Sequence, residues 1–597
     1  MRSSIENYPD FEPVWQPLAP LAMNLADSDV QTQSPVRPRV CDTCIRKKVK
    51  CNQARPACSR CTERGENCVY SAKRRRPGPP PGSQRTSSKP RTASVLPGSR
   101  RTREEPSVVV DLLPSPPPSV PAAHQPVELR NQDCSPTVFE SNREEQLLEA
   151  FFDILRDVNP IHDKARFLYD YHNSCCDSAL ISTITTITEK LTGSVLAANV
   201  TSIDTRIDSL LSSTALQESL FTDSPVLDEY RKSCVLAAYE FHQFPGHQSW
   251  MRLGSLARMA LRTGLDRLEH LRAYQPEWRA LSEQDMEEWR AVWWCIYRLD
   301  SYSNLASGTP YLISEDLVAT AFILRNVSQS FEETDSVPQL LLSSHPENIW
   351  KLISTLSSYP GTTIANIHNI TTTMMRQVGS LTRVYQVRPV EETNAKITEV
   401  ERRFSALRLA LPPNWLNPKR NAFSGERTLE HHERLVTNLQ LWMTRLLLAI
   451  FRCCRQHGEE WLRSWEQVLE TCQNIVAIAE QWDSSFCIKV DPAIAFVIFT
   501  SLIFLDLHEK SIATSGENLQ AQIEHDKTVL RFMLEHFATI WTLPRLLSLS
   551  FATFSESIQG PLTEQHLKRI LLRFEAPLHS RWLQFLSDPQ KYLENSQ

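Results

Sequence analysis

The 597-residue sequence predicts three successive parts: a small cysteine-rich module, a linker without a core, and a large all-α domain. Six of its 15 cysteines fall within residues 41–68, so the first part is defined by them. Thirteen prolines follow between Pro77 and Pro126, where a helix or strand cannot be sustained. From about residue 141 glycine becomes scarce and apolar residues recur at spacings of three and four, which is typical of packed helices.

The cysteine-rich module consists of one unit, C-x2-C-x6-C, that occurs twice in tandem. Cysteines separated by two residues are typical of metal sites, because two thiolates on one turn can hold a single ion. Zinc prefers four sulfur ligands in a tetrahedron, so six cysteines can serve two ions only if two thiolates bridge. The natural bridging pair is the first cysteine of each unit, Cys41 and Cys58. The predicted ligands are Cys41, Cys44, Cys51, Cys58, Cys61 and Cys68.

Two other interpretations of these cysteines are weaker. A single four-cysteine zinc ribbon would leave Cys51 and Cys68 unexplained, although both stand at the same offset within their units. A disulfide framework requires an oxidising compartment, and the N-terminus does not resemble a secretory signal. The remaining nine cysteines are scattered or adjacent in pairs, which fits buried free thiols in a reducing compartment. The sequence therefore favours a metal module in an intracellular protein.

The same stretch resembles the binuclear zinc cluster, Zn2Cys6, of fungal transcription factors. The resemblance rests on the six cysteines, on the basic run from Arg46 to Lys50, and on Pro56, two residues before the fourth cysteine. It implies a DNA-binding domain at residues 37–76 that holds two zinc ions and binds double-stranded DNA. In this family the end of the first helix enters the major groove and reads a CGG-type triplet.

The first helix of the module is predicted from Asp42 to about Lys50, with the Asp42 carboxylate at its positive end. It would project Arg46, Lys47, Lys48 and Lys50 from one end of the module. The resemblance implies that Lys47 and Lys48 reach base edges, where lysine donors suit the O6 and N7 acceptors of guanine. Other cations are placed to contact phosphates, which fix position and not sequence; these are Arg55, Arg60 and Arg75.

The charge distribution supports a polyanion as the partner of the module. Residues 37–103 carry 19 basic and 3 acidic side chains, whereas the rest of the chain carries 45 basic and 66 acidic ones. A compact positive segment on an acidic body is typical of nucleic-acid binding. The basic run at residues 73–76 has the charge density of a nuclear localisation signal, so we expect a nuclear protein.

The segments that flank the module have the composition of disordered chain. Residues 1–36 form an acidic tail with aromatic residues among prolines, which also suits an activation segment that docks on transcriptional coregulators. Residues 77–140 form a linker rich in proline, serine and arginine. Between Pro77 and Pro136 no proline-free stretch exceeds nine residues, so a dimerising coiled coil cannot form there. Any homodimer should therefore arise from the helical domain.

Residues 141–597 are predicted to form one all-α domain, with Ser141 and Glu144 as a capping box before its first helix. The most apolar segment, near residue 500, is shorter than a membrane span of about 20 residues, so we expect a buried helix and no membrane partner. Further helices are expected at residues 226–243, 249–263, 282–302, 364–385, 392–409, 428–455, 460–482, 492–508, 517–540 and 563–573.

Two segments of this domain are similar to the middle homology region of the same fungal factors. They read WMRLGSLARMALRTGL, with small residues on one face, and WWCIYRLD followed by SGTP. Ser282 and Asp285 predict a capping box ahead of the second segment, and the apolar stripe from Met286 to Ile296 is interpreted as core. Asp300 falls near this stripe and needs a cationic partner if it is buried, for which Arg258 is the candidate.

The resemblance implies a sequence-specific transcription factor that regulates RNA polymerase II genes of a metabolic set, such as one for secondary-metabolite biosynthesis. The alternative is a zinc-organised protein-interaction or co-regulator module without sequence-specific DNA readout. An enzyme is not expected, because the sequence contains no phosphate loop, no G-x-S-x-G elbow and no H-E-x-x-H pattern. The histidines do not cluster with acids at metal spacing, and the pair His431-His432 is predicted to be exposed on a helix.

Overall fold

The computed structural model describes residues 41–54, 57–68, 138–155, 164–193, 200–212, 226–324, 339–342, 348–359, 362–387, 391–513 and 516–587. These residues fall into two compact units, the cysteine module and a helical unit that begins at Val138. The predicted acidic tail at residues 1–36 lies outside the described residues, as does the predicted linker up to residue 137.

The cysteine module contains two short helices, α1 (Asp42–Arg46) and α2 (Ser59–Glu63). Helix α1 begins where the sequence predicts, but the expectation that it continues to Lys50 is wrong. Lys48 adopts a left-handed backbone conformation, with φ of 52°. A right-handed helix cannot pass through this conformation, so the chain turns away directly after α1.

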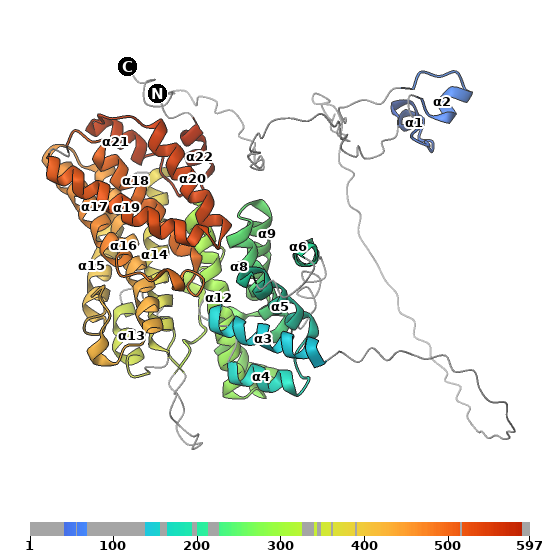
Figure 1. The fold of residues 1–597 in the computed structure, drawn as a ribbon, viewed down its shortest axis with the longest axis horizontal. Helices are drawn as coiled ribbons and strands as arrows, with labels where there is room; N and C mark the ends of the chain where they lie inside the picture. The colour runs from blue at the N-terminus through green and yellow to red at the C-terminus, as the bar shows by residue number, and fades with distance from the viewer. Residues whose placement is uncertain are drawn as a thin grey trace, which may run out of the picture. The chain divides into compact units, whose positions relative to one another are not determined.

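The helical unit confirms the predicted all-α class. Among the described residues from 138 to 587 no strand forms, and the only isolated bridges pair Ala321 with Leu341 and Ser511 with Leu562. The helices, labelled in Figure 1, are α3 (Val138–Ile154), α4 (Lys164–His172), α5 (Ser178–Thr192), α6 (Val200–Ser212), α8 (Leu227–Gln243), α9 (His247–Thr263), α10 (Leu268–Tyr274), α11 (Pro276–Arg279), α12 (Glu283–Ser307), α13 (Ile349–Leu356), α14 (Thr363–Val387), α15 (Glu391–Ala410), α16 (Thr428–Arg455), α17 (Gly458–Ala479), α18 (Ala495–Glu509), α19 (Glu517–Ala538), α20 (Thr542–Ser557), α21 (Glu564–Leu571) and α22 (Ser580–Ser587).

Helix α12 connects the first helices of this unit with the later ones (Figure 1). It packs against α8 and α9 on one side and against α14 on the other. Helix α16 contacts both α14 and α17, and α18 packs against α17, α19 and α20. The middle of the unit is therefore formed by α12, α14, α16 and α18, and the side chains of α12 and α18 are buried along nearly their whole length.

The sequence predicts capping boxes before two of the helices, and one of them forms. The Ser282 hydroxyl accepts a hydrogen bond from the Asp285 N–H over 3.1 Å, and the Asp285 carboxylate accepts one from the Ser282 N–H over 3.2 Å. These two bonds begin α12 as predicted. The prediction for Ser141 and Glu144 is wrong, because α3 begins at Val138 and Ser141 already lies inside it.

A continuous apolar core fills the helical unit. The predicted stripe on α12 belongs to it, since Met286, Trp293 and Ile296 are at most 1% exposed and Trp289 is 9% exposed. The apolar segment near residue 500 is also buried, as predicted. Among the described residues, Pro492–Glu509 is the one helical stretch long and apolar enough to cross a membrane, and 94% of it is covered by the rest of the unit. This is the environment of a core helix.

Several helices fall outside the predicted set, and their sequences show why. Helix α5 contains the run ITTIT, whose β-branched residues disfavour an isolated helix. Its threonine hydroxyls bond to the preceding turn, as Thr183 does to the Ala179 carbonyl over 2.8 Å, and its apolar face joins the core. Helix α20 carries Pro544 in its first turn, where proline is tolerated. The other helices that the sequence did not predict are α4, α6, α10, α11, α13 and α22.

The adjacent histidines of α16 are buried, which corrects the expectation of an exposed pair. His431 is 5% exposed and His432 is 2% exposed. The His432 ring stacks on Phe486 with ring centroids 3.9 Å apart, and its Nε2 accepts a hydrogen bond from the Asp483 N–H over 3.1 Å. Burial lowers the pKa of both rings, so they pack in the core as neutral side chains.

Acid should destabilise the helical unit through the buried His508 of α18, which stacks on Trp465 with ring centroids 3.8 Å apart. Burial lowers the pKa of His508 to about 3, from about 6.5 for an unperturbed histidine. Between these two values the unfolded chain binds a proton that the folded chain excludes. The contribution of this residue to the free energy of unfolding should therefore fall by about 1.4 kcal/mol per pH unit as the pH falls from about 6.5 toward 3.

The variant His508→Phe keeps the stacking and removes the titration, so its unfolding free energy should depend less steeply on pH in urea titrations. His525→Gln is the matched control, because the side chain of His525 is 60% exposed. Equal pH slopes for wild type and His508→Phe would show that this prediction is wrong.

Candidate metal centre and nucleic-acid interface

The six thiols of the cysteine module converge as two overlapping groups of four. Within each group the sulfur atoms all lie within 4.8 Å of one another. The two residues that belong to both groups are Cys41 and Cys58, which the sequence analysis selects as bridges. The groups are Cys41, Cys44, Cys51 and Cys58, and Cys41, Cys58, Cys61 and Cys68.

The sulfur separations fit a tetrahedral zinc site. Cys41 Sγ lies 3.7 Å from the sulfurs of Cys58 and Cys61, and 3.9 Å from that of Cys51. Cys44 Sγ lies 3.7 Å from Cys58 Sγ. A tetrahedron with Zn–S distances of about 2.3 Å has edges of about 3.8 Å, whereas a disulfide brings two sulfurs to about 2.05 Å. The arrangement therefore fits two zinc ions that share two thiolates.

The environment of the inner thiols also suits a cation. The four inner thiols, those of Cys41, Cys44, Cys58 and Cys61, are at most 2% exposed. Burial raises the pKa of the Cys41 and Cys44 thiols, so without a metal these side chains would keep their protons. Zinc binding releases those protons and leaves thiolates. The Cys58 N–H donates to Cys68 Sγ over 3.2 Å, a bond of the kind that holds a ligating thiolate in place.

The two halves of the module end their helices in the same way. The residue that reverses the chain is Lys48 in the first half and Gly65 in the second, with φ of 52° and 63°. The following N–H then donates to the carbonyl of the second cysteine of its half, over 3.1 Å after Lys48 and 2.9 Å after Gly65. This is the longer hydrogen bond of a Schellman cap, and in the second half the Gly65 N–H also donates to the Thr62 carbonyl over 3.2 Å to complete the motif. Glycine adopts the left-handed conformation freely, whereas for lysine it costs about 1 kcal/mol. Lys48 is therefore held in a strained position beside the metal ligands.

The basic residues of the first half differ in their availability. Arg46, Lys47, Lys48 and Lys50 are all exposed, and Lys48 has no carboxylate partner among the described residues. Lys47 donates to the Glu66 carboxylate in the second half, and this bond lowers the pKa of Glu66. Lys47 and Lys48, which the resemblance pairs as base readers, are thus presented differently: Lys47 is tied to the other half, and Lys48 is not.

The remaining predicted phosphate contacts are only partly described. Arg60 lies on α2 and is half-buried, whereas Arg55 and Arg75 lie outside the described residues.

Glu66 joins the two halves through its bond with Lys47, a role that the sequence analysis did not predict. A signal was present, because Glu66 is one of only three acidic residues in the basic segment 37–103. A second tie between the halves is the Thr43 hydroxyl, which donates to the Asn67 carbonyl over 2.8 Å.

In the helical unit a buried ionic group surrounds Asp300 on α12, which is 3% exposed. Its carboxylate accepts hydrogen bonds from Arg376 Nη1 over 3.0 Å and from the N–H groups of Leu312 and Ile313, each over 3.2 Å. The prediction that Arg258 is the partner of Asp300 is wrong, because Arg258 is exposed on α9. The true partner comes from α14, 76 residues farther along the chain.

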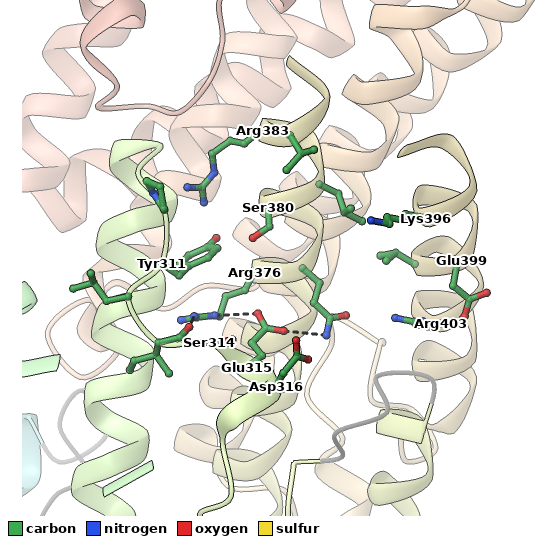
Figure 2. A pocket seen from close by; sticks show the side chains of 17 residues that line it. Tyr311, Ser314, Glu315, Asp316, Arg376, Ser380, Arg383, Lys396, Glu399 and Arg403 are labelled. Carbon is green, nitrogen blue, oxygen red and sulfur yellow. Dashed lines mark hydrogen bonds and ion pairs between the residues drawn. The ribbon is translucent and has the colours of Figure 1, made fainter. Parts of the chain in front are cut away.

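The guanidinium of Arg376 is engaged on every side. It lies between the rings of Tyr297 and Tyr311, with 4.5 and 4.2 Å to their centroids. Its Nε donates to the Glu315 carboxylate over 3.2 Å (Figure 2), and its Nη2 donates to the Ile313 carbonyl over 2.5 Å. These contacts fix α12, α14 and the segment 308–316 to one another, so the group has a structural role.

Two family models match the chain. The fungal Zn(2)-Cys(6) binuclear cluster domain matches residues 39–77, which include all six cysteines. The fungal specific transcription factor domain matches residues 148–406, from within α3 to within α15, and so includes the buried group around Asp300. No solved structure matches the chain.

Curated relatives match over short segments. The chain is 54% identical over 35 residues to the transcriptional regulator claA of Penicillium crustosum, and 52% identical over 40 residues to the transcriptional regulator alnR of Emericella nidulans. It is 45% identical over 56 residues to the Hps1-dma1 cluster transcription factor tfc7 of Dothistroma septosporum. These segments are 6%, 7% and 9% of this chain and 7%, 10% and 15% of the respective relatives, so the likeness is local.

The two parts of the chain thus each match a domain family of fungal proteins, and the sulfur geometry of the first part fits the two metal ions of a binuclear cluster. The chain carries a fungal Zn(2)-Cys(6) binuclear cluster domain and a fungal specific transcription factor domain, and its cluster domain holds two zinc ions.

Proposed function

We propose that this chain is a sequence-specific DNA-binding regulator of transcription whose zinc module reads a CGG-type triplet. The observation that carries the proposal is the double four-sulfur site with Lys48 and Lys50 exposed beside it. Metal binding supplies the folding free energy of so small a module, on the order of 10 kcal/mol per structural site. The zinc ligands in this proposal are the six cysteines, with Cys41 and Cys58 as the bridges.

Within the module the roles follow from the contacts. Lys48 is the proposed base reader, because its turn is fixed by a hydrogen-bonded cap and its ammonium lacks a carboxylate partner among the described residues. Lys47 would have to leave Glu66 to reach a base edge, so we assign it first to joining the two halves. Arg46, Lys50 and Arg60 supply positive charge toward the phosphates, which sets the position of the module on the duplex.

The rest of the proposal concerns the cell and the partners. The chain acts in the nucleus on RNA polymerase II genes, and its helical domain regulates and assembles without catalysing a reaction. Coregulators and a homodimer formed by that domain are the proposed protein partners. One relative is named as a cluster transcription factor, which supports a metabolic gene cluster as the target.

The alternative is a zinc-organised protein-interaction module in which the lysines are only surface charge. Mutation of the base reader distinguishes the two. Lys48→Ala keeps a Cβ and therefore the same left-handed strain, so the stability and the zinc content of the module should stay unchanged. Affinity for a duplex that carries the CGG triplet should fall by about 1–3 kcal/mol, and affinity for a scrambled duplex should fall much less. Fluorescence anisotropy on the full chain measures both.

Two further variants calibrate this experiment. Arg75→Ala should weaken both duplexes alike and reduce the salt dependence of binding, as the loss of a phosphate contact does. Lys419→Ala removes an exposed lysine of the helical unit and should leave both affinities unchanged. If the wild-type chain binds both duplexes equally, or Lys48→Ala weakens both equally, the base-reading proposal fails and the interaction module becomes the better description.

A further inference from the structure

Glu66 in the second half of the cysteine module holds Lys47 of the first half. The Lys47 ammonium donates to the Glu66 carboxylate, and these two side chains are 46% and 27% exposed. The next residue, Lys48, has no carboxylate partner among the described residues. Two adjacent lysines at one turn therefore differ in whether their charge is free to meet a polyanion.

The backbone on both sides of this ion pair is fixed. The Glu66 N–H donates to the Cys61 carbonyl over 2.9 Å, and the carbonyl of the next residue, Asn67, accepts from the Thr43 hydroxyl over 2.8 Å. The Lys47 N–H donates to the Thr43 carbonyl over 3.1 Å. An ion pair between side chains on fixed backbone loses less conformational entropy when it forms than a pair on mobile segments. The contact is therefore a restraint on Lys47.

Other charges near Glu66 differ from Lys47 in their contacts. The charges of Arg46 and Arg64 also act on the Glu66 carboxylate, so this carboxylate lies close to three cations. Glu63, on α2, is exposed and has no ion-pair partner within the described part of the module. Glu66 is thus the carboxylate that holds a lysine beside the proposed base reader, and Glu63 is not.

A restrained lysine changes how the module responds to different sequences. Phosphate contacts raise the affinity for every duplex and carry no sequence information. A free ammonium next to the base reader would add one such contact. On scrambled DNA the module can settle wherever this contact forms, whereas on the triplet its position is set by Lys48. Withholding Lys47 therefore lowers the affinity for scrambled DNA more than the affinity for the triplet.

We propose that Glu66 is a specificity-determining residue that holds the Lys47 ammonium away from the phosphates of DNA without the triplet. It is a positioning residue, because it acts through Lys47. This role rests on the proposed function of the module in DNA binding, and it adds a residue that increases selectivity by limiting affinity.

The test is fluorescence anisotropy of the full, zinc-loaded chain on a scrambled duplex between about 50 and 200 mM salt. Glu66→Gln should bind this duplex about two- to fivefold more tightly than the wild type, which is the range that an exposed ion pair can hold back. The slope of log affinity against log salt should become steeper by about one, because one more phosphate is contacted. On the CGG duplex the gain should be smaller, so the ratio of the two affinities falls.

Two variants control for charge. Glu63→Gln removes the same charge from the same half of the module and releases no lysine, so it should change the affinity by less than about 1.5-fold and leave the salt slope as it is. The double variant Lys47→Ala/Glu66→Gln has the net charge of the wild type and lacks the ammonium. It should bind the scrambled duplex as the wild type does.

The proposal is overturned if Glu66→Gln binds the scrambled duplex as the wild type does or more weakly, if Glu63→Gln gains as much, or if the double variant keeps the gain. Loss of zinc would weaken binding, so a gain in affinity cannot come from a damaged module. Because these readouts use the scrambled duplex, they decide the role of Glu66 even if Lys48→Ala shows that no base is read. The failure of either proposal is therefore distinguishable from the failure of the other.

Discussion

Replacement of Cys58 by serine is expected to remove both zinc ions and unfold the cysteine module. Cys58 belongs to both groups of four sulfurs and lies 3.7 Å from the sulfurs of Cys41 and Cys44. A serine hydroxyl is a poor zinc ligand, so each ion would lose one of its four sulfurs at the same time. Because metal binding provides the folding free energy of such a module, on the order of 10 kcal/mol per site, the loss should be complete.

Cys44→Ser is the informative comparison, because Cys44 belongs to one group only. This variant should lose one zinc ion more readily than the other and retain part of its metal. Elemental analysis of the dialysed full-length chain gives the zinc content of each variant directly. Cys175→Ser, which changes an exposed thiol of the helical unit, should retain two zinc ions. One zinc ion per wild-type chain, or equal zinc contents for Cys58→Ser and Cys44→Ser, would rule out two shared thiolates.

The second large effect is expected in the helical unit, from Arg376→Met. This change leaves the Asp300 carboxylate buried, with its side chain 2% exposed, and without its cation. Removing one member of a buried ion pair typically costs about 3–5 kcal/mol, because the other charge stays uncompensated. Arg402→Met is the matched control: it removes an ion pair with Glu399 whose arginine is 72% exposed, and such surface pairs contribute about 0–1 kcal/mol.

The double variant separates the loss of the cation from the loss of packing. When Asp300→Asn is added to Arg376→Met, the buried charge at position 300 is removed as well, so only Glu315, whose side chain is 18% exposed, is left without its cation. The asparagine carbonyl can still accept from the Leu312 or Ile313 N–H. The double variant should therefore be more stable than Arg376→Met alone. Urea denaturation of the full chain measures all four proteins. A destabilisation below about 1 kcal/mol for Arg376→Met would contradict the proposed weight of this group.

The cysteine module was predictable because its chemistry is local and repeated. The spacing of six cysteines within 28 residues is enough to propose two metal sites, and the structure groups the sulfurs accordingly. The turn at Lys48 was not predictable in the same way, because nothing in the residue type of a lysine signals a left-handed backbone. The equivalent Gly65 does carry that signal, and the repeat could have transferred it to the first half.

The helical class was predictable from apolar periodicity, whereas the pairing of buried charges was not. Arg258 lies closer to Asp300 in sequence and was the natural choice, but the true partner, Arg376, depends on how α14 docks on α12. A signal was present: Arg376 directly follows Met374 and Met375 in an otherwise buried run, where an arginine needs an anion. The burial of His432 likewise depends on the packing of the segment around Phe486, and His431 bonds to the Pro418 carbonyl, contacts that no local pattern encodes.

The different residues at the two equivalent turns have a consequence for how the duplicated unit tolerates change. The copy that ends in Gly65 has the relaxed form of the turn, and the copy that ends in Lys48 gives up some stability in order to carry a side chain outward. The two repeats thus differ in role. The repeat that ends in Gly65 favours the stability of the module, and the repeat that ends in Lys48 exposes an ammonium group. Selection for a more stable domain would therefore favour glycine at both turns, whereas selection for a better contact surface would favour a residue with a long side chain.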